Sequence, residues 1–375
     1  MPSVFLVSIG AVWFSTVGYL VLLALVAAIR RRRAPAVRRA RPELPAVAVV
    51  VPTWNESPLI SRKLANLAAT RYPSDRIRVL VADGGSSDGT AEIVRGYRFF
   101  GNEVPVLTFD GGAHQAAQIS MALDAVPEEI VVVTDADAEL APDCLEKLVL
   151  HLLEHPRTAV VGALVEPETG MPEEAVYWWL RNLLWSLEGE ALGCANVSGV
   201  CFAARRSRFR PGPRAHAFDI RVALCGALAG WEVRLCRAAR ARELRVPQGR
   251  REFLRFRVRR GTGFLRELLD AWRAGSLPRR LRVACVVRLW NLLLTPFFVA
   301  AAAVAGSALL STRLWWVPPA TTALAFAPLF ALPLLSSTLR PWARSRLPIA
   351  TLRCAFWTWQ SLLRIATSAA RTVPS

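Results

Sequence analysis

Several apolar stretches in the first 140 residues end in acidic or amide side chains. These strand-end residues are Asn55, Glu56, Asp83, Asp135 and Asp137. In an open parallel sheet, ligands bind beyond the carboxyl ends of the strands, and side chains at these positions are expected to gather at one edge. Carboxylates suit Mg²⁺ or Mn²⁺, which are usually bound together with substrate phosphates and water. The pattern therefore predicts a site for a divalent cation and a diphosphate.

The Asp-Ala-Asp triplet at 135–137 is weak evidence by itself, because two neighbouring acids are also typical of a solvated turn. Two features favour a ligand site over such a turn. The triplet ends the apolar run VVVT, and Asp83 ends a second apolar run. Paired carboxylates repel each other unless a cation lies between them. We therefore predict Asp135 and Asp137 as the metal ligands.

Strands that alternate with helices must position these residues. Apolar runs near 46–52, 77–82 and 131–134, with a shorter one in EVPVLTFDG, predict four strands, and helical patterns lie between them. Continuous apolar strands are typical of a sheet that is covered on both faces. The order predicts an α/β fold with a doubly wound, mixed sheet flanked by helices.

Composition indicates a membrane protein with a large soluble part. Of 375 residues, 53% are hydrophobic, mean hydropathy is +0.30 and the formal charge is +18, with a pI of about 11.1. Such a charge raises the question of nucleic acid binding. The arginines, however, lie beside the most apolar stretches, where a positive-inside bias would place them. We expect membrane lipids and no nucleic acid as partners. Seven scattered cysteines without CxxC argue against a zinc site or a disulfide scaffold.

Three uncharged stretches are each long enough to cross a bilayer: 4–29, 289–312 and 314–339. A cleaved signal peptide is the alternative for the first stretch. Its apolar part is too long, however, and its positive cluster follows the apolar part instead of preceding it. Residues 348–367 contain two arginines and are better interpreted as an amphipathic helix at the membrane surface.

These segments divide the chain into four parts. We expect an N-terminal transmembrane helix (1–30), a basic linker (31–45), a cytosolic domain (46–280) with interfacial helices near 250–280, and a C-terminal membrane region (281–375). The arginines that follow the first stretch place the N-terminus outside and the domain in the cytosol. The prediction is a multi-pass protein of the cell membrane.

The motifs VVPTWNE, VLVADGGSSDGT and VVVTDADAEL, in this order, resemble the membrane-associated members of glycosyltransferase family 2, which have the GT-A fold. The resemblance runs from about residue 46 to 270. It implies that the first two motifs bind the nucleotide of a sugar donor and that Asp135 and Asp137 face its ribose and diphosphate through Mg²⁺ or Mn²⁺. The donor residues implied are Pro52, Thr53, Asn55, Glu56, Asp83 and Asp135.

The segment AFDIRVALCGALAGWEVRLC (217–236) resembles the family segment that holds the catalytic acid. Asp219 lies eleven residues before Gly230, as in the family, although Phe218 replaces the usual preceding acid. The resemblance implies that Asp219 is the general base of an inverting transfer. The alternative is a plain helix start, because an acid in the first turn is favoured by the helix dipole alone.

The run REFLRFRVRRG (251–261) resembles the family's E-F-x-R-K-x-R type segment. The other version, Q-x-x-R-W, would need Gln at Leu254 and Trp at Val258, and its absence argues against a processive synthase. The resemblance implies that Arg257 and Arg260 contact the donor diphosphate. The alternative is a basic interfacial helix whose arginines meet anionic lipid headgroups.

The segment NVSGVCFAARRSRF resembles the family's G-x-x-(F/Y)-A-x-R-R segment. The resemblance implies that Gly199 allows the acceptor to approach the backbone closely and that Trp231, the aromatic residue after Gly230, also lies on the acceptor side. The aromatic stretch 175–193 is either an interfacial helix or a core helix. We predict an inverting, cation-dependent transferase that moves a sugar from a UDP-sugar to a lipid or glycan acceptor. The alternatives are a polyprenyl-phosphate sugar transferase and a non-catalytic membrane scaffold.

Overall fold

A mixed sheet forms the centre of the computed structural model, which describes residues 1–33, 42–109, 114–208, 215–275, 277–335, 339 and 346–371. Within these residues eight strands pair in the order β5-β2-β1-β6-β9-β8-β10-β7. They are β1 (Val47–Thr53), β2 (Ile77–Asp83), β5 (Val106–Thr108), β6 (Ile130–Val133), β7 (Ala138–Leu140), β8 (Thr158–Pro167), β9 (Phe202–Arg205) and β10 (Glu232–Glu243). A separate hairpin pairs β3 (Arg98–Phe99) with β4 (Asn102–Glu103).

The N-terminal half of the sheet is parallel. β1 pairs in parallel with both β2 and β6, and every residue of β1 is buried, as its apolar sequence predicts. In this register Thr53 lies opposite Asp83, and the carboxyl ends of β1, β2 and β6 therefore meet at one edge. The antiparallel strand β9 separates this half from β8 and β10. The predicted mixed α/β sheet is confirmed.

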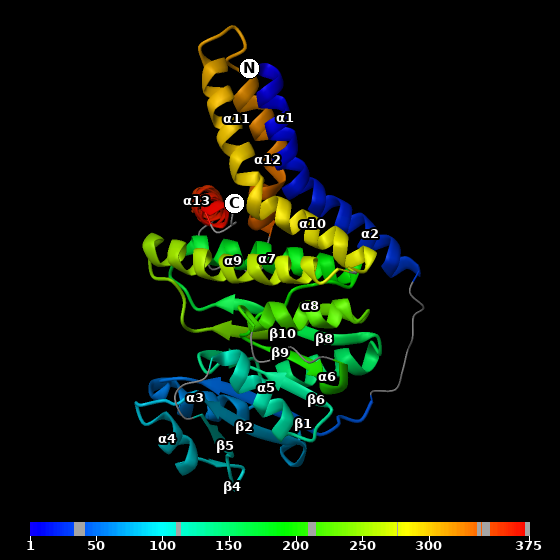
Figure 1. The fold of residues 1–375 in the computed structure, drawn as a ribbon, viewed down its shortest axis with the longest axis vertical. Helices are drawn as coiled ribbons and strands as arrows, with labels where there is room; N and C mark the ends of the chain where they lie inside the picture. Colours follow the sequence, from blue (N-terminus) through cyan, green and yellow to red (C-terminus); the bar gives the residue numbers. More distant parts are fainter. Residues whose placement is uncertain are drawn as a thin grey trace.

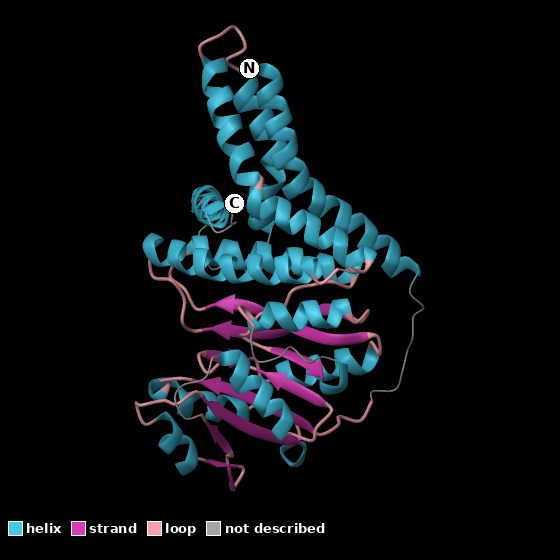
Figure 2. Cartoon of the chain, in the orientation of Figure 1, coloured by secondary structure: helices cyan, strands magenta, loops and turns pink. Residues whose placement is uncertain are grey.

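Helices cover the sheet, as Figures 1 and 2 show. They are α3 (Ser57–Ala68), α4 (Thr90–Gly96), α5 (Gln115–Ala125), α6 (Cys144–Glu154) and α8 (Phe218–Leu228). The buried face of α3 follows helical spacing through Ile60, Lys63, Leu64 and Leu67. A lysine therefore occupies a position where the pattern calls for an apolar residue.

A second layer, of long helices, lies between the sheet and a protruding helical column (Figure 1). It contains α7 (Pro172–Leu192), α9 (Arg250–Arg273) and α13 (Leu347–Arg371), and α13 packs on both α7 and α9. A buried ion pair joins α7 to α9 through Glu174 and Arg257. A second buried pair joins α7 to α10 through Glu188 and Arg288, and Tyr19 donates a hydrogen bond to Glu188.

The column contains the helices that sequence analysis assigns to the membrane: α1 (Pro2–Trp13), α2 (Tyr19–Arg33), α10 (Arg279–Leu293), α11 (Thr295–Leu310) and α12 (Val317–Leu335). A short π-helix, Phe14–Gly18, joins α1 to α2. Among the described residues, one continuous helix, Pro2–Arg32, is long and apolar enough to cross a membrane, and α10 and α11 pass the same test only together, with a 47° bend between them. The predicted number of three spans stays a prediction.

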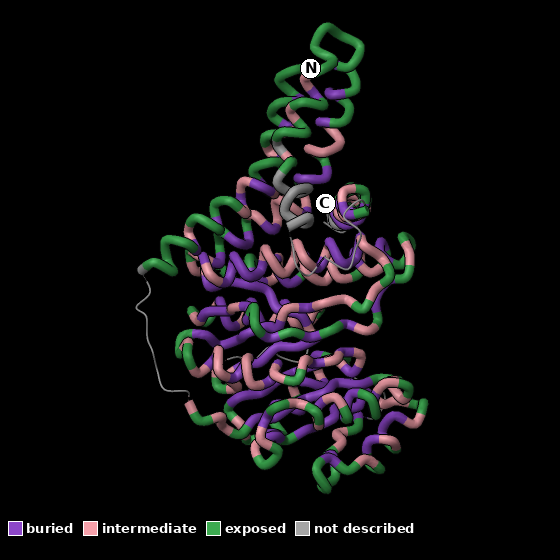
Figure 3. The backbone as a smooth tube through the Cα atoms, turned by 180° about the vertical axis from the view of Figure 1, so that it is seen from behind, coloured by how far each residue is buried: buried purple, intermediate pink, exposed green. Residues whose placement is uncertain are grey.

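The bend falls inside the predicted span 289–312 and has a local cause. Pro296 is the second residue of α11, and proline lacks the N–H that would continue the hydrogen-bond pattern of α10. Figure 3 shows long exposed stretches on α1 and α11, and apolar side chains such as Val7 and Val304 are exposed there. Exposed apolar surface of this extent is typical of a membrane or partner contact.

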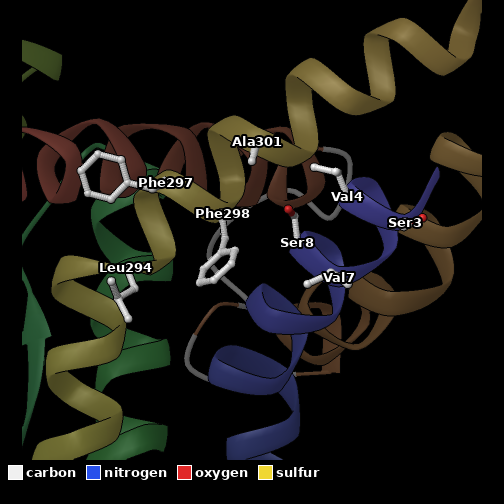
Figure 4. A pocket seen from close by; sticks show the side chains of 8 residues that line it. All are labelled: Ser3, Val4, Val7, Ser8, Leu294, Phe297, Phe298 and Ala301. Carbon is white, nitrogen blue, oxygen red and sulfur yellow. The ribbon is translucent and has the colours of Figure 1, made fainter. Parts of the chain in front are cut away.

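A hollow of about 630 Å³ lies between α1 and α11 and is lined by Ser3, Val4, Val7, Ser8, Leu294, Phe297, Phe298 and Ala301 (Figure 4). None of these side chains titrates or binds metal strongly. The hollow belongs to the helical column and lies far from the acidic edge of the sheet in Figure 1. The chemistry must therefore be sought at the sheet.

Candidate active site at the carboxyl edge of the sheet

Asp83 is the most buried acid of the site, with no exposed surface. Its Oδ1 atom accepts hydrogen bonds from the hydroxyls of Thr53, at 3.2 Å, and Ser86. Its Oδ2 atom accepts from the backbone amides of Gly85, at 3.2 Å, and Ser86, at 3.0 Å. These four hydrogen bonds hold the carboxylate in one orientation. Asp83 therefore fixes the loop after β2 against the end of β1.

The loop after β1 is held to the same place. Asn55 has a φ of +55°, a left-handed conformation that asparagine tolerates better than most residues. Its backbone N–H donates to Ser86 Oγ at 2.8 Å, and its side-chain Oδ1 accepts from the backbone N–H of Ser87 at 2.9 Å. The amide of Glu56 donates to Thr90 Oγ1 at 2.9 Å. The two motif loops thus form one surface beside Asp83.

The acidic turn follows β6 on the other side of β1. Strands in a sheet lie about 4.8 Å apart, and the ends of β2 and β6 are therefore separated by about 10 Å. Gln115 Nε2 donates to Asp135 Oδ1 at 2.8 Å. Burial, together with the charges of Asp137 and Asp219, raises the pKa of Asp135 to about 7. Burial also raises the pKa of Asp137, although Arg245 opposes the shift.

Gly199 joins this turn to Asp219. The Gly199 amide donates to Asp219 Oδ2 at 3.3 Å, while a Cβ atom at Gly199 would lie 3.1 Å from Asp135 Oδ2. Asp219 lies in the first turn of α8, as predicted, and its Oδ1 accepts from the Ile220 amide at 2.9 Å. The structure therefore brings Asp83, Asp135, Asp137, Gly199 and Asp219 to one edge.

Two arginines from the end of β10 and from α9 face this negative edge. Arg245 donates to both oxygens of Glu56, at 2.9 and 2.8 Å, and its Nε lies 3.9 Å from Asp137 Oδ2. Arg260 forms an ion pair with Glu243 at 2.7 Å, and the charges of Glu243 and Asp219 outweigh burial and raise its pKa. A hollow of about 360 Å³ borders Arg245 and is lined by Leu59, Arg62, Glu168, Leu244 and Arg245.

Two predicted site residues have contacts outside the acidic cluster. Arg257 is buried in an ion pair with Glu174, and its guanidinium carbon lies 3.3 Å from the centre of the Tyr177 ring, within the α7–α9 packing. Trp231 follows the far end of α8, a helix whose eleven residues span about 16 Å, and it stacks with Arg208 at 4.0 Å. The structure therefore gives both side chains partners away from Asp219.

Several residues at the site were not predicted: Ser86, Gln115, Lys63 and Arg245. Ser86 stands inside a recognised motif and its spacing from Asp83 could have indicated it. Lys63 carried a weaker signal, since it is a charged residue on the apolar face of a helix. Gln115 and Arg245 have no local signal, because their partners are distant along the chain.

The Glycosyl transferase family 2 model matches residues 48–210, which include Asp83, Asp135 and Asp137. Residues 48–210 are a glycosyltransferase family 2 domain. Asp219 and the arginines of α9 lie beyond the matched residues.

Curated relatives share parts of this family 2 domain. An N-acetylglucosaminyltransferase of Rhizobium meliloti is 34% identical over 146 residues, 38% of this chain and 32% of the relative. A beta-monoglucosyldiacylglycerol synthase of Synechocystis is 29% identical over 140 residues, 37% of this chain and 28% of the relative. The alignments with these relatives thus span about a third of the relatives' own length.

A solved structure resembles almost the whole chain. It is the mannosyltransferase PcManGT of Pyrobaculum calidifontis, in complex with GDP-Man and Mn²⁺. The TM-score is 0.67 at 25% sequence identity, over 94% of this chain and 99% of that chain. The fold around the family 2 domain is therefore GT-A-like.

Proposed function

We propose that this chain is a membrane-bound, inverting glycosyltransferase that moves a sugar from a nucleotide-sugar donor to a lipid or glycan acceptor. The observation that supports this most is the convergence of Asp83, Asp135, Asp137 and Asp219 at one sheet edge, with Gly199 beside both Asp135 and Asp219. The similarity to PcManGT and to named glycosyltransferases supports the same reaction class.

Asp135 and Asp137 would hold Mg²⁺ or Mn²⁺. The fit rests on charge. Burial and the neighbouring charges of Asp137 and Asp219 raise the pKa of Asp135, and a divalent cation would relieve the repulsion between these acids. Among the described residues, no cluster of three or more His, Cys, Asp or Glu side chains could hold a metal. A two-carboxylate site completed by donor phosphates and water is typical of magnesium. When bound, the cation would neutralise charge on the donor diphosphate.

The donor would lie along the ends of β1, β2 and β6. Pro52, Thr53, Asn55, Glu56 and Asp83 would contact the nucleotide, which we propose is uridine, and Asp135 would face the ribose and diphosphate. Of the two arginines predicted to bind the diphosphate, Arg260 is close enough to Asp135 and Asp219 to interact electrostatically with both. Its guanidinium would stabilise negative charge as the diphosphate leaves.

Asp219 would act as the general base. An acceptor hydroxyl attacks the anomeric carbon, and its proton passes to the Asp219 carboxylate. The bond from the anomeric carbon to the diphosphate oxygen breaks, and its electron pair leaves with the nucleoside diphosphate. The anomeric configuration inverts because attack and departure take place on opposite faces. Gly199 allows the Asp135 carboxylate to approach the backbone of this loop, because a Cβ atom at this position would lie 3.1 Å from Asp135 Oδ2.

The membrane assignment rests on the helical column. The apolar helix Pro2–Arg32 and the bent pair α10–α11 would cross or enter the bilayer, with the arginines after residue 29 on the cytosolic side. The layer of α7, α9 and α13 would then face the membrane surface, with the family 2 domain in the cytosol. A lipid acceptor would reach Asp219 from this layer.

One observation favours the second candidate, a polyprenyl-phosphate acceptor. Arg181 of α7 is half-buried, lies 4.2 Å from the Trp185 ring centre and donates to Tyr177 Oη at 2.5 Å. Among the described residues no carboxylate forms an ion pair with Arg181, and burial lowers its pKa. An acceptor phosphate would supply the missing negative charge.

A non-catalytic scaffold is the rival explanation, because Phe218 replaces an acid that is usual in the family. A panel of radiolabelled UDP- and GDP-sugars, incubated with the purified full-length protein and membrane lipids with and without Mn²⁺, separates the two. We expect Mn²⁺-dependent transfer or donor hydrolysis with one donor. The absence of both with every donor would support the scaffold.

A further inference from the structure

Lys63 is a buried lysine whose presence packing does not explain. Its side chain is 1% exposed, on the face of α3 that also buries Ile60, Leu64 and Leu67. An aliphatic residue would fill this position without the desolvation cost that a buried charge carries. Among the described residues no acid forms an ion pair with its ammonium group, and burial lowers the pKa of Lys63 to about 8.

The two hydrogen bonds of Lys63 enclose the acidic turn. Its Nζ donates to Thr134 Oγ1 at 2.7 Å and to the Ala138 carbonyl at 2.8 Å. Thr134 precedes Asp135 and Ala138 follows Asp137. One ammonium group therefore fixes both ends of the turn that contains the two proposed metal ligands.

The same contacts continue to the acceptor side. Thr134 Oγ1 donates to the Val200 carbonyl at 2.7 Å, and Val200 follows Gly199, whose amide donates to Asp219. The path from Lys63 through Thr134 to Val200 thus connects the acidic turn with the loop that contacts the proposed base. Each link in this path is a short hydrogen bond between buried groups, and such bonds are costly to leave unmade.

We propose that Lys63 is a positioning residue that holds the Asp135–Asp137 turn in its cation-binding arrangement and in register with the Gly199 loop. This inference rests on the proposed function, since it assigns a role in the same site. Lys63 itself does not touch donor or acceptor. Its positive charge also lies close enough to Asp135 and Asp137 to interact with both electrostatically.

The test compares K63M with K147M. Lys147 is the other lysine of the chain; it is part-exposed and pairs with Asp143 at 2.6 Å on the surface of α6. UDP binding to the full-length protein is measured by calorimetry over a range of Mn²⁺ concentrations, together with thermal unfolding. For K63M we expect the Mn²⁺ concentration at half-maximal binding to rise by about 10–100-fold, the usual effect of losing a group that orients metal ligands. K147M should match the wild type.

A second variant protects the test against misfolding. T134V removes the hydroxyl that links Lys63 to Val200 while nearly preserving side-chain volume, and it should raise the Mn²⁺ requirement in the same direction. In the double variant K63M/T134V the two effects should not add, because each single substitution already breaks the hydrogen-bonded path from Lys63 through Thr134 to Val200. A merely structural lysine would lower the unfolding temperature of K63M without changing the Mn²⁺ requirement of the folded fraction.

The outcomes separate the two proposals. Wild-type protein that binds UDP in a Mn²⁺-dependent way, with folded K63M and T134V variants that behave identically to it, would overturn the role of Lys63 alone. The role of Lys63 would also be overturned if K63M failed to fold and T134V bound UDP with the Mn²⁺ dependence of the wild type. Wild-type protein without any Mn²⁺-dependent UDP binding would overturn the proposed function, and the positioning role with it.

Discussion

The backbone amide of Gly199 lies 3.3 Å from the Oδ2 atom of Asp219. A Cβ atom on the same glycine would lie 3.1 Å from Asp135 Oδ2. The residue therefore lies beside both the proposed base and one of the proposed metal ligands.

This relationship predicts that G199A weakens Mn²⁺-dependent UDP binding by about 10–100-fold, because the added methyl group displaces Asp135. Calorimetry at fixed Mn²⁺ measures the effect. G170A is the matched control, since no atom lies within 4 Å of a Cβ at this exposed glycine. Equal UDP affinity in G199A and wild type would show that Mn²⁺-dependent binding does not depend on the close contact between Gly199 and Asp135.

D219N should reduce sugar transfer by about 10²–10⁴-fold and leave UDP affinity nearly unchanged, since the base acts on the acceptor and not on the nucleotide. Transfer from the labelled donor identified in the panel measures this. Asp124, an exposed acid of α5, supplies the control D124N. Normal turnover of D219N would mean that Asp219 only starts a helix.

The strand ends of the first half could be predicted from the sequence because their signals are local. Asp83 and Asp135 each follow an apolar run, and helices separate the runs. The insertion of β9 between β6 and β8 could not be predicted, since strand order depends on tertiary packing. The same holds for the contacts of Lys63 with Thr134, 71 residues away, and of Arg245 with Glu56, 189 residues away.

Arg257 illustrates the limit of a motif. Its position in the sequence matches a donor-binding arginine, but α7 supplies Glu174 as a buried partner. We expect R257M to lower the free energy of unfolding by about 3–5 kcal/mol, because Glu174 is left as an uncompensated buried charge, and to leave UDP affinity unchanged in the folded protein. Denaturant unfolding and calorimetry measure the two effects.

Two further variants complete this comparison. E174Q/R257M should recover part of the loss, because it leaves no unpaired charge. R255M, at an exposed position of the same helix, should change stability by less than about 0.5 kcal/mol. A large loss of UDP affinity in R257M with normal stability would support the donor-binding role instead.

The lowered pKa of Lys63 also predicts how the free energy of unfolding depends on pH. Its pKa falls from 10.5 to about 8 in the folded protein. Between these values the unfolded chain binds more protons than the folded one, and stability therefore rises with pH across this window. The gain from this group is about 3 kcal/mol between pH 8 and pH 10.5. The difference in unfolding free energy between wild type and K63M should change by this amount, and a constant difference would show that the ammonium is solvated.

The most direct test of the whole account is calorimetry of UDP binding to the full-length protein, in Mn²⁺ and again in EDTA. If Asp135 and Asp137 hold a cation that bridges to the donor diphosphate, affinity should fall by at least about 10-fold in EDTA, and D137N in Mn²⁺ should bind as weakly as wild type in EDTA. Tight UDP binding that is identical with and without the metal would contradict the account.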